Sequence, residues 1–283
     1  MKSLKIRKKA KALGTLVLIK LVLSVLIIVG LAEISKRISP QIGGIISGLP
    51  LGTGLSIYFI SFEQGVDFTI KGVPWGIAGL SASILFCVIY LLVSRMKEST
   101  NRILLIAKSS FISIASFFIF GYFIFLMKFN LFQAILIFTT VFFINLFIIN
   151  KLIRTPEKTN KPTSTLLQIL SRGVTVGIIL LIITGVASIV GSKWAGILSS
   201  FPSTLFPLIL VLHYEEGSKL FPYVIFGFSY SISTLLVFYL CYIYFVPLYG
   251  LNIGFLIIYG ICVIYLYFFR KIQVTLRLTR RSQ

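Results

Sequence analysis

The chain consists of long apolar runs separated by short polar segments. Nine runs stand out, near residues 13–33, 41–61, 72–94, 103–126, 131–150, 167–190, 194–213, 221–246 and 251–270. At a rise of 1.5 Å per residue, a helix of each run is about as long as the hydrocarbon core of a bilayer is thick, roughly 30 Å. The runs lack the alternating pattern of barrel strands, and lipid tolerates only helices or closed barrels. The pattern therefore predicts an all-α, polytopic membrane protein with about nine transmembrane helices, placed in the cell membrane as a multi-pass protein.

The amino-acid composition supports a membrane protein and changes how the high positive charge is interpreted. Hydrophobic residues make up 57% of the 283 positions and charged residues 12%, against about 25% charged in a soluble domain. The formal net charge of +20 would suggest a nucleic-acid partner in a soluble protein. Here the basic residues gather at the two termini, within 2–11 and 270–281. We therefore expect anionic lipid head groups, and no nucleic acid, as partners of the termini.

The sequence also repeats itself once. Residues 44–65 align without a gap on 196–217, and after a contraction of four residues 71–84 align on 219–232. In the first stretch the identical pairs are Gly44/Gly196, Ile45/Ile197, Ser47/Ser199, Pro50/Pro202, Ile57/Ile209, Glu63/Glu215 and Gly65/Gly217. Self-similarity at a fixed spacing predicts a duplicated structural unit.

The repeat divides the chain into three parts. Residues 1–128 form a first four-helix module with a basic N-terminal segment, and 129–164 hold a connecting helix and a polar linker. Residues 165–283 form a second four-helix module with a basic C-terminal tail. Five spans, an odd number, separate the starts of the modules, so this 4+1+4 layout predicts two inverted repeats, as in many transporters. Whether 41–61 and 194–213 cross fully stays open, because their glycines and prolines also suit a broken or re-entrant helix.

The repeated prolines are the first candidate site residues. Pro50 and Pro202 lie near the middle of their apolar runs, beside the small residues Ser47 and Ser199. A proline inside a helix removes a backbone donor and clashes with the preceding turn, so each helix should kink or break there. One interpretation is a pair of discontinuous helices that frame a central substrate site. The other is a kink that lets helices pack closely.

Two pairs of charged residues complete the candidate substrate-binding set. Glu63 and Glu215 end the same two runs and could be carboxylates at the mouths of a pathway, or solvated helix ends beside a glycine cap. Lys20 and Arg172 lie inside the first run of each module. They could face a cavity for an anionic substrate, or extend to the membrane surface.

The stretch from Lys193 to Ile232 resembles the GlpM-like small membrane proteins. The residues that carry the resemblance are Ala195, Gly196, Phe201, Pro202, His213, Tyr214, Gly217, Phe226 and Gly227. The first module departs from that pattern at the His-Tyr and Phe-Gly steps. Members of this family are single four-helix modules, so the resemblance implies a helical membrane fold and a chain that joins two such modules.

Function is inferred from the repeat and from motifs that the sequence lacks. There is no P-loop, HExxH motif, dinucleotide-binding loop or Cys/His cluster, so we expect no enzyme, cofactor or metal site. The favoured hypothesis is a transporter or flippase-like permeation protein with its site between the two inverted repeats, acting on a small-molecule or lipid substrate that is anionic or lipid-linked. The alternative is a non-transporting scaffold or accessory subunit of an envelope or lipid-processing system.

Overall fold

The computed structural model describes residues 48–96, 101–153 and 166–281, together with positions 18, 19, 22, 25 and 26. The side chains of 166, 168, 169, 171, 172, 188, 270 and 272–281 are outside this description. Every regular element in these residues is a helix, which confirms the all-α prediction for this part of the chain. The elements are α3 (Leu51–Gln64), α4 (Val66–Val93), α5 (Arg102–Leu126), α6 (Leu131–Leu152), α7 (Leu166–Ser199), α8 (Leu205–Glu216), the 3-10 turn η1 (Gly217–Lys219), α9 (Phe221–Ser231) and α10 (Ser233–Arg281).

Four helical segments are long and apolar enough to cross a membrane: α4, α5, α6 and the stretch Phe221–Phe269 within α9 and α10. They indicate a membrane protein. This number is smaller than the nine expected spans. Most of the run 13–33 and the first part of 41–61 lie outside the described residues. The run 194–213 is interrupted by a break that leaves only short helices on each side, and the run 167–190 contributes only the shorter apolar stretch Gly173–Ala187. The two expected spans 221–246 and 251–270 are counted together in Phe221–Phe269.

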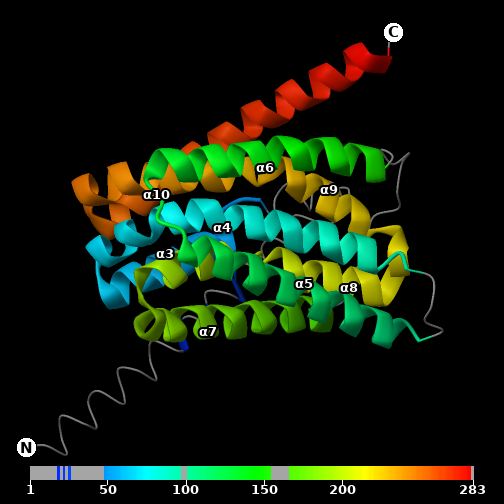
Figure 1. The fold of residues 1–283 in the computed structure, drawn as a ribbon, viewed down its shortest axis with the longest axis horizontal. Coiled ribbons are helices and arrows are strands. Elements are labelled where there is room, and N and C mark those ends of the chain that lie inside the picture. Colours follow the sequence, from blue (N-terminus) through cyan, green and yellow to red (C-terminus); the bar gives the residue numbers. More distant parts are fainter. Residues whose placement is uncertain are drawn as a thin grey trace, which may run out of the picture.

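Glycines reverse the chain inside α7 and α10. Gly191 has φ 80° and ψ 172°, and Gly250 has φ 75° and ψ 170°, a conformation that is almost restricted to glycine. Each reversal falls between two expected spans. After Gly250 the chain returns beside itself (Figure 1), so that the rings of Phe238 and Phe255 lie 5.8 Å apart. The long helix α10 is therefore two antiparallel helices joined at Gly250.

Helix α4 is the centre of the bundle. It packs against α5, α6, α7 and α10, and its side chains are mostly buried. By contrast, α5 and α6 expose large apolar side chains such as Phe111, Phe132 and Phe147, each more than 70% accessible. Such faces are unfavourable in water and suit the lipid that would surround a membrane protein.

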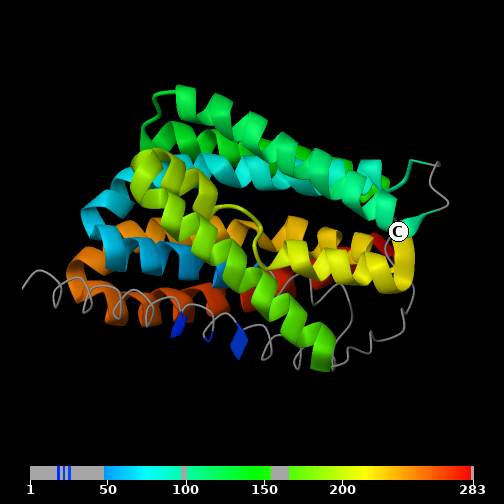
Figure 2. The same ribbon diagram turned by 90° about the horizontal axis from the view of Figure 1, so that it is seen from below.

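The two short helices α3 and α8 point away from each other. Both begin near the centre of the molecule; α3 runs to one end of the bundle and α8 to the other (Figures 1 and 2). At its end each helix passes through a glycine with positive φ, Gly65 (φ 93°) and Gly217 (φ 60°), before the next helix starts.

Candidate functional site

The break at Pro50 is a tight turn centred on the proline. The amide of Leu51 donates to the carbonyl of Leu49 at 2.7 Å, and Pro50 has φ −73° and ψ 44°. A hydrogen bond between residues i+2 and i with these angles is close to an inverse γ-turn. The Pro50 carbonyl then accepts the amide of Gly54 at 2.6 Å, which starts α3. Helix α3 therefore begins directly after this proline; the chain before Gly48 lies outside the described residues, so whether an earlier helix breaks here stays a prediction.

The break at Pro202 repeats these hydrogen bonds. The amide of Ser203 donates to the carbonyl of Phe201 at 2.7 Å, and the amide of Phe206 donates to the carbonyl of Pro202 at 2.8 Å. Each bond lies 152 residues after its counterpart at Pro50. Here α7 ends at Ser199 and α8 begins at Leu205, so the segment is a broken helix. The two prolines build the same backbone turn at the spacing of the sequence repeat.

The two breaks touch each other. Gly52, in the first turn of α3, faces the other break so closely that a Cβ atom on it would overlap the hydroxyl of Ser203 and lie 3.1 Å from Cγ2 of Thr204. Thr204 is the N-cap residue of α8. The N-terminal ends of α3 and α8 therefore meet at the centre of the bundle. Each helix N-terminus carries a partial positive charge and unpaired amides, so the meeting point favours a negatively charged group.

Hydroxyl groups from other helices satisfy carbonyls at the breaks. Tyr259 donates to the carbonyl of Pro50 at 2.9 Å, and Ser83 of α4 donates to the carbonyl of Ser200 at 2.5 Å. The hydroxyl of Ser199 bonds to that of Tyr239 at 2.8 Å. Carbonyls freed from a helix persist at membrane depth only where protein or enclosed water satisfies them. These bonds close the centre of the bundle in this conformation.

The hydroxyl of Ser203 is the polar group at the centre that is open to a further partner. Ser203 is 2% exposed, and its Oγ accepts or donates no hydrogen bond within the described residues. Buried hydroxyls in proteins are nearly always paired, so this one is a candidate to bind a water molecule or a ligand group, on a side other than that of Gly52, which packs too closely to leave room. Ser203 and Thr204 were not among the predicted site residues. The sequence does mark them as the start of a helix, because Ser and Thr are preferred N-cap residues and an apolar run follows them directly.

The remaining candidates do not join this site. Glu63 and Glu215 are half-buried at opposite ends of the bundle, so the pair cannot form one carboxylate site. The guanidinium of Arg102 donates to the carbonyl of Glu215 at 3.3 Å and so pairs a carbonyl at the end of α8. Lys20 and Ser47 lie outside the described residues, and of Arg172 the structure describes the place in α7 without its side chain.

One tyrosine bonds to each of the short helices α8 and α3. On α8, Nδ1 of His213 bonds to the hydroxyl of Tyr90 at 3.0 Å. On α3, the hydroxyl of Ser61 bonds to that of Tyr242 at 2.6 Å. Positions 61 and 213 are again 152 residues apart. We call these the His213 contact and the Ser61 contact. Each joins a half-helix of one part of the chain to a long helix of the other part.

The described residues contain no group of three or more His, Cys, Asp or Glu that could hold a metal ion. No protein-family model, no curated protein and no solved structure matches this chain, so the geometry above is the basis for its functional interpretation.

Proposed function

We propose that this chain is a multi-pass transporter or flippase-like permeation protein of the cell membrane, with its pathway between two inverted repeats. The observation that carries the proposal is the pair of breaks at Pro50 and Pro202, which share one backbone turn, meet at the centre and send α3 and α8 to opposite ends. Secondary transporters typically bind substrate where discontinuous helices meet near the bilayer midplane.

The directions of the long helices support the inverted 4+1+4 arrangement with nine crossings. Helix α4 runs one way along the bundle, and the segment from α9 to Gly250 runs the other way (Figure 1). Helix α5 and the last part of α10 are likewise opposed. Helix α6 then serves as the connecting crossing. The GlpM-like resemblance extends this proposal to two fused modules.

A reciprocal contact gives independent support. Ser83 bonds to the carbonyl of Ser200, and a Cβ atom on Gly48 would overlap the hydroxyl of Ser231. Ser231 follows Ser83 by 148 residues and Ser200 follows Gly48 by 152, which are the two offsets of the sequence repeat. If residue i of one unit contacts residue j of the other, and the repeat equivalent of i contacts the repeat equivalent of j, then a two-fold relation between the units is the simplest arrangement.

The chemistry of the centre favours an anionic or lipid-linked substrate. Two helix N-termini attract a negative group, and the Ser203 hydroxyl supplies a donor beside them. Lys20 and Arg172 remain predictions as further cationic contacts. Because the His213 and Ser61 contacts lie toward opposite ends, alternate opening of the two would expose the centre first to one side and then to the other.

The close packing of the centre favours a second candidate, the non-transporting scaffold or accessory subunit. A Cβ atom on Gly196 would overlap the carbonyl of Gly72 and lie 3.0 Å from the amide nitrogen of Gly76. Such backbone contact holds helices firmly together. A transporter must loosen this packing during its cycle, whereas a scaffold never does.

The first experiment tests the inverted arrangement. Single cysteines replace the exposed Gln64 and Glu216, next to Glu63 and Glu215, in a chain whose three native cysteines are changed to alanine. A membrane-impermeant maleimide applied to intact cells should label one position, and the other should react only after permeabilisation. Labelling of both positions from the same side would refute the inverted repeat.

The second experiment separates transport from a scaffold role. Glu63→Gln and Glu215→Gln are compared with the unchanged protein for substrate uptake and lipid translocation in reconstituted vesicles. Substrate uptake or lipid translocation by the unchanged protein supports transport, and its loss in a variant places that glutamate on the pathway. Absence of both activities in the unchanged protein favours the scaffold.

A further inference from the structure

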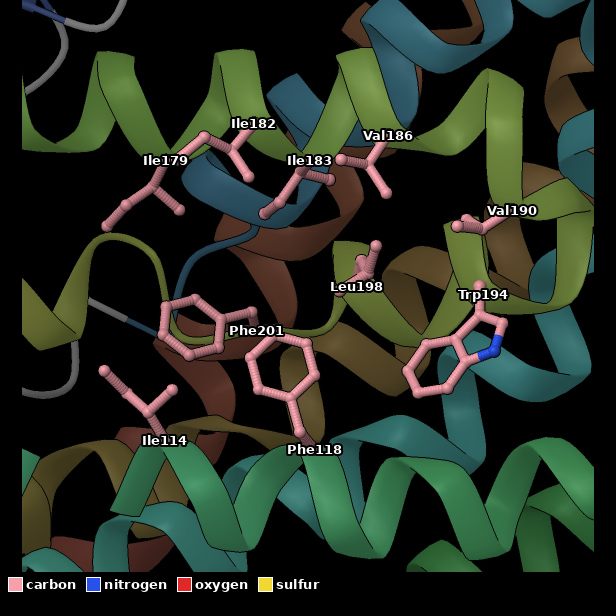
Figure 3. A pocket seen from close by; sticks show the side chains of 10 residues that line it. All are labelled: Ile114, Phe118, Ile179, Ile182, Ile183, Val186, Val190, Trp194, Leu198 and Phe201. Carbon is pink, nitrogen blue, oxygen red and sulfur yellow. The ribbon is translucent and has the colours of Figure 1, made fainter. Parts of the chain in front are cut away.

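An apolar groove opens on the outer face of the bundle between α5 and α7. It has a volume of about 510 Å³, within the range of roughly 300–1,000 Å³ that is typical of small-molecule sites. Phe118 of α5 faces Ile182 and Val186 of α7 across it (Figure 3). Its floor includes Phe201, the residue before the central Pro202, and every side chain that lines it is apolar.

The surroundings of the groove determine what can fill it. Helix α5 is one of the segments long and apolar enough to cross a membrane, and the walls face outward, since Phe118 is 45% and Ile182 is 59% exposed. At this depth water-soluble partners are absent and the available apolar molecules are lipids. An acyl chain can fill a groove that offers no polar group as a hydrogen-bond partner.

A lysine and a tryptophan lie at one end of the groove. Trp194 lines it (Figure 3) and stacks on Phe125 of α5 at 5.5 Å. The neighbouring Lys193 places its ammonium 4.7 Å from the centre of the Trp75 ring and 5.8 Å from that of Phe125. Both residues follow directly on the Gly191 reversal, where α7 turns back. Tryptophan and lysine at a helix end are typical of the membrane–water interface, where lipid phosphates lie.

We propose that this groove binds an anionic phospholipid, with its phosphate at Lys193 and one acyl chain between α5 and α7 that reaches toward Phe201. An acyl chain gains little by leaving the bilayer for an equally apolar groove, so the charge of the head group must provide the selectivity. The proposal goes beyond the transport function, and it holds or fails without reference to substrate movement.

Tryptophan fluorescence gives a direct test, because the chain has two tryptophans and Trp194 lines the groove. Trp75→Phe leaves Trp194 as the only reporter. The purified full-length variant is mixed with phosphatidylglycerol or phosphatidylcholine brominated in the acyl chains. Half-maximal quenching should need an about fivefold lower mole fraction of the anionic lipid, since one lysine at an anionic surface contributes about that factor. Lys193→Gln should remove this difference.

A second pair of variants tests the groove itself. Val186→Phe fills part of it and should raise the mole fraction of brominated phosphatidylglycerol needed for half-maximal quenching by roughly twofold or more. Ile178→Phe is the matched control on the same helix; this side chain is 50% exposed and lies outside the groove. Equal quenching by the two lipids in the protein with Lys193 would overturn the proposal. So would unchanged quenching in a folded Val186→Phe variant; if that variant does not fold, the Lys193→Gln comparison decides.

Discussion

Two serines on α4 offer a controlled test of how the break at Pro202 is stabilised. Ser83 and Ser81 are both buried, with 0% and 1% of their surface exposed. The hydroxyl of Ser83 donates to the carbonyl of Ser200 at 2.5 Å, whereas that of Ser81 has no hydrogen-bond partner within the described residues. Replacing each by alanine removes the same atom from the same helix, so the hydrogen bond is the main difference.

The size of the destabilisation expected for Ser83→Ala follows from the position of the accepting carbonyl. Ser200 comes directly after the last residue of α7, where carbonyls lose their intrahelical partners. An intramolecular hydrogen bond contributes about 0.5–1.5 kcal/mol, and those between membrane helices average about 0.6 with a maximum near 1.7 kcal/mol. Ser83→Ala should therefore lower the free energy of unfolding by about 1 kcal/mol, roughly fivefold in the equilibrium constant. Ser81→Ala should leave it unchanged or raise it, because an unpaired buried hydroxyl is costly.

Unfolding by a denaturing detergent, followed by circular dichroism in mixed micelles, measures both variants on one scale. The double variant adds a check, since the two effects should sum if the serines act separately. Equal destabilisation by Ser81→Ala and Ser83→Ala would show that the hydrogen bond to Ser200 is not the cause. An unchanged stability of Ser83→Ala would show that this bond contributes nothing.

Three further predictions concern the reversals, the ends and the centre. Gly191→Ala should lower the free energy of unfolding by about 1–3 kcal/mol, because its φ of 80° suits only glycine. Gly185→Ala is the matched control on the same helix, where a Cβ atom also meets open space. It should raise the free energy of unfolding by roughly 0.5–1 kcal/mol. Tyr90→Phe should raise the rate at which maleimide modifies a cysteine at position 216, at the end of α8, and should leave the rate at position 64, at the end of α3, unchanged. Tyr242→Phe should have the reverse effect. Equal rate changes at both positions would contradict two separate closures. Gly196→Ala should abolish the folded protein, measured as loss of monodisperse material in size-exclusion chromatography, since its Cβ would overlap a carbonyl of α4.

The sequence predicted the local elements well because lipid imposes a simple rule on them. The expected spans 103–126 and 131–150 agree with α5 and α6 to within two residues at each end. An apolar run in a membrane must form a helix, since only the helix satisfies all of its backbone groups locally. The break at Pro202 and the start of α3 after Pro50 agree with the same reasoning, because proline removes a donor from the helical ladder.

The candidate site was predicted only in part. The prolines and Ser199 do lie at the centre, but Glu63 and Glu215 lie near the C-terminal ends of α3 and α8, which run to opposite ends of the bundle (Figure 1). The repeat in sequence could not distinguish residues that meet at the centre of the bundle from residues that lie far from it. Ser203, which lies against Gly52 at this centre, differs from its counterpart Leu51 and is therefore missed by a search for identical residues.

What the sequence alone determined is therefore the helical class, the bounds of helices such as α5 and α6, the break at Pro202 and an apolar character that suits a membrane, since these depend on apolar length and on residues that break a helix. The tertiary structure decided which side chains donate hydrogen bonds to the carbonyls at these interruptions. Ser83 reaches a carbonyl 117 residues away, and Tyr259 reaches Pro50 across 209 residues. No local pattern encodes such partners, because they depend on how whole helices cross, and helix crossings depend on the shape of many side chains at once.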